Sequence, residues 1–145
     1  MNETIYIHYG DDKFIPEKFD EIKNECGWPK PMGGLWASRT DTDWGWKDWC
    51  SSEDFHLDSF SKSFKFKLKE GSKVLEVHHV NDIDKYIINT NKFPKSINFE
   101  KILIDGYDAV ELFHGDNYNE LHDGIFYSWD CDSIVILNKE CIIPL

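Results

Sequence analysis

The segment FSKSFKFKLK, residues 60–69, alternates between apolar and polar side chains. Phe64, Phe66 and Leu68 occupy every second position, and lysines lie between them. Successive side chains of a β-strand point to opposite faces, so this pattern predicts a strand with one buried and one exposed face. A turn is expected at residues 70–72, and residues 73–80 are expected to form the hairpin partner.

Several other segments carry β-branched and aromatic residues and are bounded by turn-forming residues. Further strands are expected at residues 4–10, 33–38, 107–113, 124–129 and 133–138. Short helices are expected at residues 17–26, within 40–50, at 81–88 and at 99–104. Because strands dominate and are mostly joined by turns, the 145 residues predict one domain, residues 1–145, with an α+β fold and a largely antiparallel sheet.

The chain is acidic, with 27 Asp and Glu residues against 16 Lys and Arg residues and a net charge of −11. A surface of this sign repels nucleic acid and disfavours attachment to anionic membranes, so a protein or a small molecule is expected as the partner in preference to nucleic acid. No apolar run approaches the ~20 residues that span a bilayer, and no secretory signal is visible at the N-terminus. The four cysteines show no CxxC pair or zinc-type spacing. A reduced, cytoplasmic protein without a metal is therefore expected.

Tryptophan is concentrated in one part of the chain. Of six tryptophans, five lie at positions 28, 36, 44, 46 and 49. Two adjacent glycines, at positions 33 and 34, precede the second of these tryptophans. Glycine admits a close backbone approach, and indole rings can wall a flat ligand. The segment is thus the first candidate for a binding site.

The order of the motifs along the chain is also informative. His8 lies on the first predicted strand, and GLW (34–36) lies on the second. A predicted helix ending in WC (49–50) follows, and the acidic sequence SWDCD (128–132) opens the last long strand. This order resembles the ADP-ribosyltransferase superfamily of the His-Tyr-Glu type, to which poly(ADP-ribose) polymerases and diphtheria-type toxins belong. The resemblance covers most of the chain and implies a split, mostly antiparallel sheet with a few short helices.

The resemblance implies roles for the first strand. In the family, a histidine there bonds the adenine-side ribose of NAD⁺, and a nearby backbone glycine holds the nicotinamide amide. His8 corresponds to the histidine. The chain reads His8-Tyr9-Gly10, with a tyrosine inserted before the glycine that family members often carry directly after the histidine.

On the second strand, the family has an aromatic residue that stacks on the nicotinamide. Gly34-Leu35-Trp36 corresponds to this motif, with tryptophan in place of tyrosine. Indole offers a large π face to a cationic ring. Ser38 shares the strand face of Trp36 and could hold the nicotinamide amide or a phosphate, and Arg39 is the best candidate for a pyrophosphate contact.

A second aromatic wall is expected from the helix that follows this strand. Trp49 has the right order along the chain, and Trp44 and Trp46 are alternatives. In this interpretation, the tryptophans form walls around a flat cationic ring and the glycines admit it.

The family's third motif is a glutamate on the closing strand, which bonds the nicotinamide ribose and stabilises the developing ribosyl cation. This chain has Asp130 and Asp132 near that place, and an ungapped match puts Ser133 at the glutamate position. Asp132 is the favoured catalytic acid, Asp130 is the second candidate, and the absence of a catalytic acid is the third possibility.

The resemblance implies a mono-ADP-ribosyltransferase that uses NAD⁺ as co-substrate, needs no metal and modifies a macromolecule, with protein favoured over nucleic acid. Small members of bacterial or phage origin often act as toxins or effectors in phage–host conflict. Hydrolysis of NAD⁺ is a related outcome. The alternative is an inactive module of the same fold that binds NAD, ADP-ribose or a protein. An RNA 2′-phosphotransferase fits less well, because the chain has few basic residues.

Overall fold

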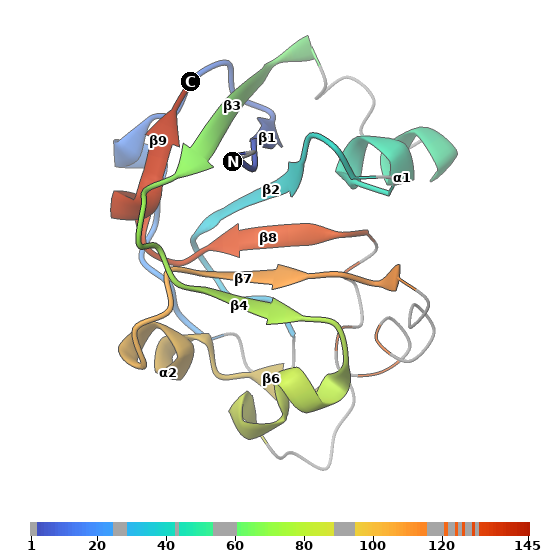
Figure 1. Ribbon diagram of the computed structural model, residues 1–145, viewed down its shortest axis with the longest axis vertical. Coiled ribbons are helices and arrows are strands. Elements are labelled where there is room, and N and C mark those ends of the chain that lie inside the picture. Colours follow the sequence, from blue (N-terminus) through green and yellow to red (C-terminus); the bar gives the residue numbers. More distant parts are fainter. Residues whose placement is uncertain are drawn as a thin grey trace.

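The structure is a computed structural model that describes residues 3–24, 29–42, 44–53, 61–88, 95–115, 121, 124, 126, 129 and 131–145. Its fold is α+β, with a seven-stranded, mostly antiparallel sheet and a few short helices (Figure 1). The strand order in the sheet is β4-β7-β8-β2-β1-β3-β9. These strands are β4 (Val74–Val77), β7 (Ala109–Leu112), β8 (Ser133–Ile136), β2 (Leu35–Arg39), β1 (Tyr6–Tyr9), β3 (Ser63–Leu68) and β9 (Ile142–Pro144).

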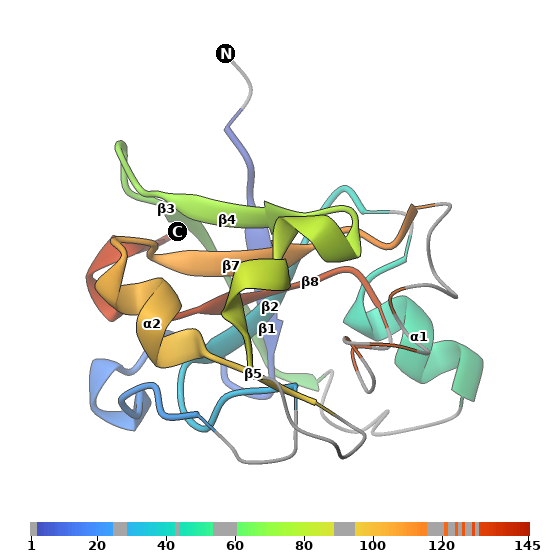
Figure 2. The same cartoon turned by 90° about the horizontal axis from the view of Figure 1, so that it is seen from below.

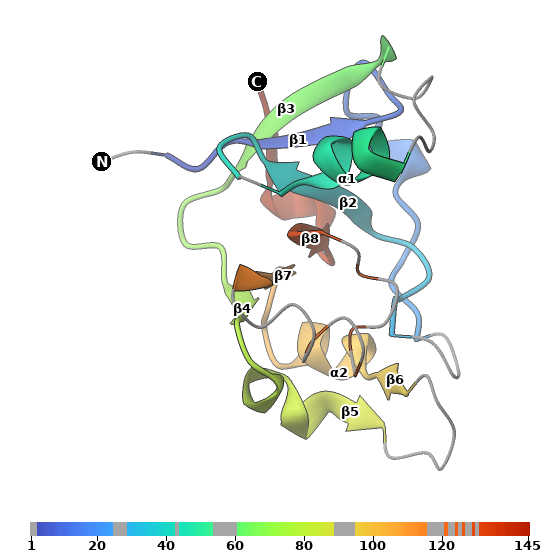
Figure 3. The same cartoon turned by 90° about the vertical axis from the view of Figure 1, so that its right-hand side faces the viewer.

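Shorter elements flank this sheet. The helix α1 (Trp46–Glu53) lies near the end of β2, away from the helix α2 (Phe99–Ile104), as Figures 1 and 2 both show. A two-stranded pair, β5 (Ile87–Ile88) with β6 (Ser96–Ile97), lies with α2 beside β4 and β7 (Figure 3). Within the described residues, no helix combines the length and the apolar character needed to cross a bilayer.

Apolar side chains cover both faces of the sheet. On one face, Val110 and Val135 pack with Phe99 of α2 and with Trp129 in a single buried cluster. On the other face, a second cluster forms around Phe66 of β3. Because side chains alternate along a strand, the central strands contribute to both clusters. All four residues of β7 are accordingly buried.

The contact between β1 and β2 is the shortest in the centre of the sheet. These strands pair only at Tyr6–Arg39 and Ile7–Ser38. In contrast, β1 pairs with β3 along its whole length, from Tyr6 to Tyr9. The second half of β1 and the first half of β2 therefore do not form a ladder with each other, and the cavity described below lies at this place.

Most predicted strands are confirmed, but the predicted hairpin of β3 with β4 is wrong. β3 lies between β1 and β9, so both of its edges already have partners. After the turn that follows β3, the chain crosses to the far side of the sheet, where β4 pairs with β7 in parallel. The alternating pattern identified the strand but carried no information about its neighbour.

The helix expected at residues 17–26 is also wrong where the structure describes it. Only a 3₁₀ turn, Pro16–Lys18, forms there, and Phe19 is extended. Asp20 and Lys23 then bond to the chain around the double glycine, since the carbonyl of Asp20 accepts from Gly34 N–H and Lys23 pairs with Met32. Tertiary hydrogen bonds thus override a weak helical pattern.

The other helix predictions were met in part. Residues 99–104 form α2, and the Asn98 side chain accepts the Lys101 N–H at its N-terminus. Residues 81–88 form 3₁₀ turns and β5 instead of one helix. Of the strand expected at residues 124–129, Gly124 and Phe126 lie in turns and Trp129 has no regular structure, and the other three residues lie outside the described part.

The buried thiol of Cys141 makes a prediction about alkaline pH. Burial, helped by the nearby Asp108 carboxylate, raises the pKa of this thiol from 9.0 to about 12. A thiol with a raised pKa stabilises the fold fully below its unfolded pKa, and this contribution is lost as the pH rises toward the folded pKa. We expect the free energy of unfolding, measured with denaturant at pH 7 to 11, to decrease above about pH 9. Cys141→Ala should flatten that decrease, and an equal slope in both proteins would contradict the prediction.

Candidate functional site

A cavity of about 280 Å³ lies where the pairing of β1 and β2 stops. Three tryptophans line it. The other lining residues come mainly from β1, β2 and the start of β8. The lining residues are Ile7, His8, Tyr9, Lys30, Trp36, Ala37, Trp46, Trp129, Cys131 and Ser133. Apolar walls with a few polar groups are typical of small-molecule sites.

His8 bridges the two strands at this point. Its Nδ1 lies 2.6 Å from the Trp36 carbonyl oxygen, so Nδ1 carries a proton and donates it. Its Nε2 lies 3.3 Å from the Asp11 carboxylate, and the ring packs on Phe64 with centroids 5.1 Å apart. Hydrogen bonds from Lys18 and from His8 hold the pKa of Asp11 below its ordinary value. The imidazole of His8 therefore connects β1 to β2 at a point where their backbones are not paired. It also lines the cavity.

Trp36 is held by a second tryptophan. Its ring meets the ring of Trp129 edge to face, with centroids 4.7 Å apart. Trp129 is 1% exposed, and its indole N–H donates to the Pro29 carbonyl at 3.0 Å. This pair fixes the orientation of the Trp36 indole toward the cavity, and the ammonium of Lys30 lies 5.4 Å from its ring centroid.

The remaining aromatic wall differs from the favoured expectation. Trp46, the first residue of α1, lines the cavity, and its backbone N–H donates to the Ser38 hydroxyl at 3.2 Å. Trp44 lines a different cavity. The side chain of Trp49 lies outside the described part of the structure. The alternative Trp46 is thus the tryptophan of this segment that joins Trp36.

Sequence reasoning missed Trp129 and Lys30 as cavity residues. Trp129 directly precedes the acidic sequence of the third motif, which is a signal that could have identified it. Lys30 lies at the start of KPMGGLW, six residues before Trp36, and no spacing rule connects the two. Only the folded path of the chain brings the ammonium over the indole.

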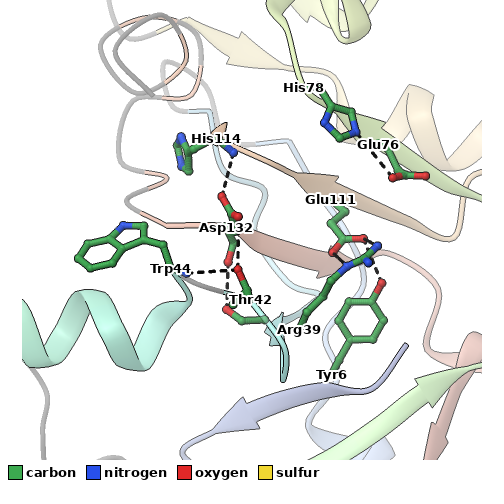
Figure 4. Close-up of polar contacts among 10 residues, drawn as sticks. Tyr6, Arg39, Thr42, Trp44, Glu76, His78, Glu111, His114 and Asp132 are labelled. Atoms are coloured by element: carbon green, nitrogen blue, oxygen red, sulfur yellow. Dashed lines mark hydrogen bonds and ion pairs between the residues drawn. The ribbon is translucent and has the colours of Figure 1, made fainter. Parts of the chain in front are cut away.

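Asp132 is not part of this cavity, which corrects the expectation that it lies with His8 and Trp36. Its neighbours Cys131 and Ser133 line the cavity, whereas the Asp132 carboxylate faces a second one. There it accepts the His114 backbone N–H at 2.8 Å and the Thr42 hydroxyl at 3.4 Å (Figure 4). Asp132 lies in a bend directly before β8, and its side chain points to the second cavity while those of its two neighbours line the first. Asp130 lies outside the described residues.

Ser38 and Arg39 also have structural partners. Ser38 is 4% exposed, and its hydroxyl donates to the Asp132 carbonyl while accepting the Trp46 N–H. Arg39 donates two hydrogen bonds to the Glu111 carboxylate, at 2.7 and 3.1 Å. Ser38 therefore joins β2 to β8 and α1, and the charge of Arg39 is neutralised inside the fold instead of facing the cavity of His8 and Trp36.

The glycines of the motifs serve the chain itself. A Cβ on Gly34 would lie 2.8 Å from the Ile136 carbonyl oxygen, and φ at this residue is +78°. Leu35, next to it, belongs to the second core cluster and lines a smaller cavity beside His8. Gly10 has φ +113° and donates its N–H to the Lys62 carbonyl. At Gly34 the close approach is thus made by the Ile136 backbone, whereas the Cβ position of Gly10 is open and only its φ is unusual.

The second cavity, of about 540 Å³, lies at the ends of β2 and β7 and the start of β8. Its lining residues are Arg39, Asp41, Thr42, Trp44, Phe113, His114, Gly115 and Asp132. Behind it, Glu111 is 3% exposed and accepts a hydrogen bond from Tyr6 as well as those from Arg39 (Figure 4). Burial and the Glu111 carboxylate raise the pKa of Tyr6, and the same carboxylate raises the pKa of Arg39.

Among the described residues, no group of three or more His, Cys, Asp or Glu side chains is arranged to hold a metal ion. Comparison of the chain with protein-family models, with curated proteins and with solved structures gave no match. The site's geometry and the sequence motifs therefore carry the functional argument alone.

Proposed function

We propose that this chain is a mono-ADP-ribosyltransferase domain that binds NAD⁺ in the cavity between β1 and β2 and transfers ADP-ribose to a protein. The observation that carries the proposal is that His8 and Trp36, from the first and second motifs, line one cavity. Ser133, at the position of the third motif, lines it too. The three strands that carry the motifs are neighbours in the order β8-β2-β1, as a single site requires.

The walls of the cavity suit one end of a dinucleotide. A volume of about 280 Å³ accommodates the nicotinamide ring with part of its ribose, between the indoles of Trp36 and Trp46. His8 also lines the adjoining cavity of about 240 Å³, which contains Lys13 and Lys18. In the proposal, the phosphates and the adenine-side ribose extend past His8 in that direction, where basic side chains favour them.

The reaction breaks the bond between the nicotinamide nitrogen and ribose C1″, and an acceptor nucleophile forms the new bond to C1″ as it loses its proton. The aromatic walls would orient the ring and exclude water. The Asp132 carboxylate lines the second cavity, so in this proposal Asp130, which lies outside the described residues, is the other candidate acid for the enzyme. Ser133 offers only a hydroxyl, which donates to the Cys131 carbonyl at 3.0 Å.

A second candidate function is binding of NAD⁺ or ADP-ribose without cleavage. The orientation of Asp132 favours it, because this carboxylate faces the second cavity and is held by His114 and Thr42. The serine in the glutamate position favours it as well. Binding and turnover must therefore be measured separately.

Binding is tested by Trp36→Ala. Loss of an indole face that stacks on a cationic ring costs about 1–2 kcal/mol, so we expect about tenfold weaker NAD⁺ binding by calorimetry. Trp36→Phe keeps a ring and should bind within a few-fold of the wild type. Trp44→Ala is the matched control, since Trp44 lines the other cavity. Equal affinity in the Trp36→Ala and Trp44→Ala proteins would refute the assignment of the cavity.

Turnover is tested by release of nicotinamide from NAD⁺ in wild type, Asp130→Asn and Asp132→Asn. The enzyme is supported when wild type releases nicotinamide and Asp130→Asn abolishes release, with Asp132→Asn retaining it. Binding of NAD⁺ without any release by the wild type identifies the binding module. Loss of release in Asp132→Asn alone would contradict the position that the structure gives this carboxylate.

A further inference from the structure

Consecutive residues of β1 point to opposite faces of the sheet, and the strand register shows which face each of them takes. Ile7 pairs with Ser38 of β2, and residues directly opposite each other in an antiparallel pair lie on the same face. Trp36 lies two residues before Ser38 and therefore shares this face. Tyr9 lies two residues after Ile7, so its side chain is on the same face of the sheet as Trp36.

The His8 side chain belongs to the other face. His8 pairs with Phe64 of β3, and the centroids of the two rings lie 5.1 Å apart. Phe64 is a member of the second core cluster, whereas Trp36 packs against the first. The two residues His8 and Phe64 also line the smaller cavity of about 240 Å³ together. His8 reaches the cavity of Trp36 at the place where the pairing of β1 and β2 stops.

Tyr9 adds an aromatic ring to the tryptophan cavity, which is the cavity of about 280 Å³ lined by Trp36, Trp46 and Trp129. Tyr9 and Trp46 also line an adjoining polar cavity of about 340 Å³, so both lie at the border between the two. Burial and the Asp48 carboxylate raise the pKa of Tyr9, and its phenol is therefore neutral at pH 7. A neutral aromatic ring at this border is suited to contact a flat ligand in the tryptophan cavity.

We propose that Tyr9, and not His8, is the residue of β1 whose side chain contacts the nicotinamide ring. This inference rests on the proposed function, in which that ring lies between the indoles of Trp36 and Trp46. Tyr9 projects from β1 on the side of the sheet that holds these indoles, whereas the imidazole of His8 packs on the opposite side. The tyrosine inserted between the histidine and the glycine of the first motif is thus assigned a role in binding. The contact is assigned to its ring and does not depend on its hydroxyl.

The variants Tyr9→Ala and Tyr9→Phe test the ring contact. Removal of a ring that contacts the nicotinamide removes apolar contact area together with the favourable interaction between the two rings. We therefore expect Tyr9→Ala to bind NAD⁺ about tenfold more weakly than the wild type. Tyr9→Phe keeps the ring and should bind NAD⁺ within a few-fold of the wild type. Tyr9→Leu fills the space without a ring, and it takes the place of Tyr9→Ala if that variant is not folded.

ADP-ribose shows which part of the dinucleotide the Tyr9 ring contacts, because it lacks the nicotinamide ring and keeps both riboses and both phosphates of NAD⁺. We expect Tyr9→Ala to bind ADP-ribose within a few-fold of the wild type. Tyr107→Ala is the matched control, because Tyr107 is also partly buried and does not line the tryptophan cavity. It should bind both ligands as the wild type does. Affinities are measured by calorimetry, and circular dichroism confirms that each variant is folded.

The outcomes distinguish this inference from the proposed function. Weaker binding of NAD⁺ with nearly unchanged binding of ADP-ribose in Tyr9→Ala supports the inference. If the wild type binds NAD⁺ but not ADP-ribose, the change in NAD⁺ affinity decides alone. If the wild type binds NAD⁺ and Tyr9→Ala binds it equally well, or loses as much affinity for ADP-ribose, the role of Tyr9 is wrong and the proposed function stands.

Two further results would also decide. Equal losses of NAD⁺ affinity in Tyr9→Phe and Tyr9→Ala would assign the effect to the hydroxyl and contradict the ring contact. If the wild type does not bind NAD⁺, the proposed function is wrong, and the inference falls with it.

Discussion

Replacing Arg39 by methionine is expected to lower the free energy of unfolding by about 3–5 kcal/mol, because it leaves the charge of Glu111 buried without its partner. The Glu111 side chain is 5% exposed and receives two hydrogen bonds from the Arg39 guanidinium. The guanidinium also lies 4.9 Å from the centroid of the Phe113 ring. The loss therefore combines an uncompensated carboxylate with lost packing. Urea unfolding monitored by tryptophan fluorescence measures it.

The double variant Arg39→Met, Glu111→Gln shows whether the buried charge is the cause. Glutamine has no charge to compensate, and its amide oxygen can still accept the hydrogen bond from Tyr6. We expect the double variant to be more stable than Arg39→Met alone by at least about 1.5 kcal/mol. Lys101→Met is the surface control. Lys101 of α2 forms an exposed ion pair with Asp105, the C-terminal cap of this helix. Such surface pairs contribute about 0–1 kcal/mol to stability. A loss in Arg39→Met no larger than in Lys101→Met would show that the pair is not a major source of stability.

The sequence was sufficient to identify most strands but not their partners. Alternation depends on burial of one face, which is a local property, and it correctly located β1 and β3; runs of β-branched, aromatic and apolar residues correctly located β2, β4, β7 and β8. Pairing depends on which strand edges are free. β9 (Ile142–Pro144) occupies the second edge of β3. A segment of three residues is too short to carry a sequence pattern that predicts this pairing. The parallel pair of β4 and β7 was consequently missed.

The candidate site was predictable to a similar degree. His8 and Trp36 could be placed together because each belongs to a recognisable strand motif, and the two strands are neighbours. Which side chain of the third motif faces the cavity depends on the bend that precedes β8, because Asp132 and Ser133 are consecutive residues and only Ser133 lines the cavity of His8 and Trp36. Lys30 enters the site from an irregular segment, where neither periodicity nor spacing applies.

Replacing the first residue of the double glycine that precedes β2 is expected to cause the second large loss of stability. Gly33 has φ +80°, and a Cβ there would meet the carbonyl oxygens of Asp20 and Glu21, the first at 2.7 Å. These are backbone atoms of the segment that also bonds Gly34, so they cannot rotate away as a side chain would. We expect Gly33→Ala to destabilise the protein by about 2–5 kcal/mol, as the sum of the cost of a positive φ and the cost of overpacking.

Gly71→Ala separates these two contributions. Gly71 has φ +87°, close to that of Gly33, and nothing lies within 4 Å of the position of its Cβ. This variant therefore reports the backbone cost alone, about 1–2 kcal/mol. The difference between the two variants in urea unfolding measures the steric conflict of Gly33 with residues 20 and 21. Equal losses would mean that this segment gives way to a methyl group, and the double glycine would then be required only for its backbone conformation.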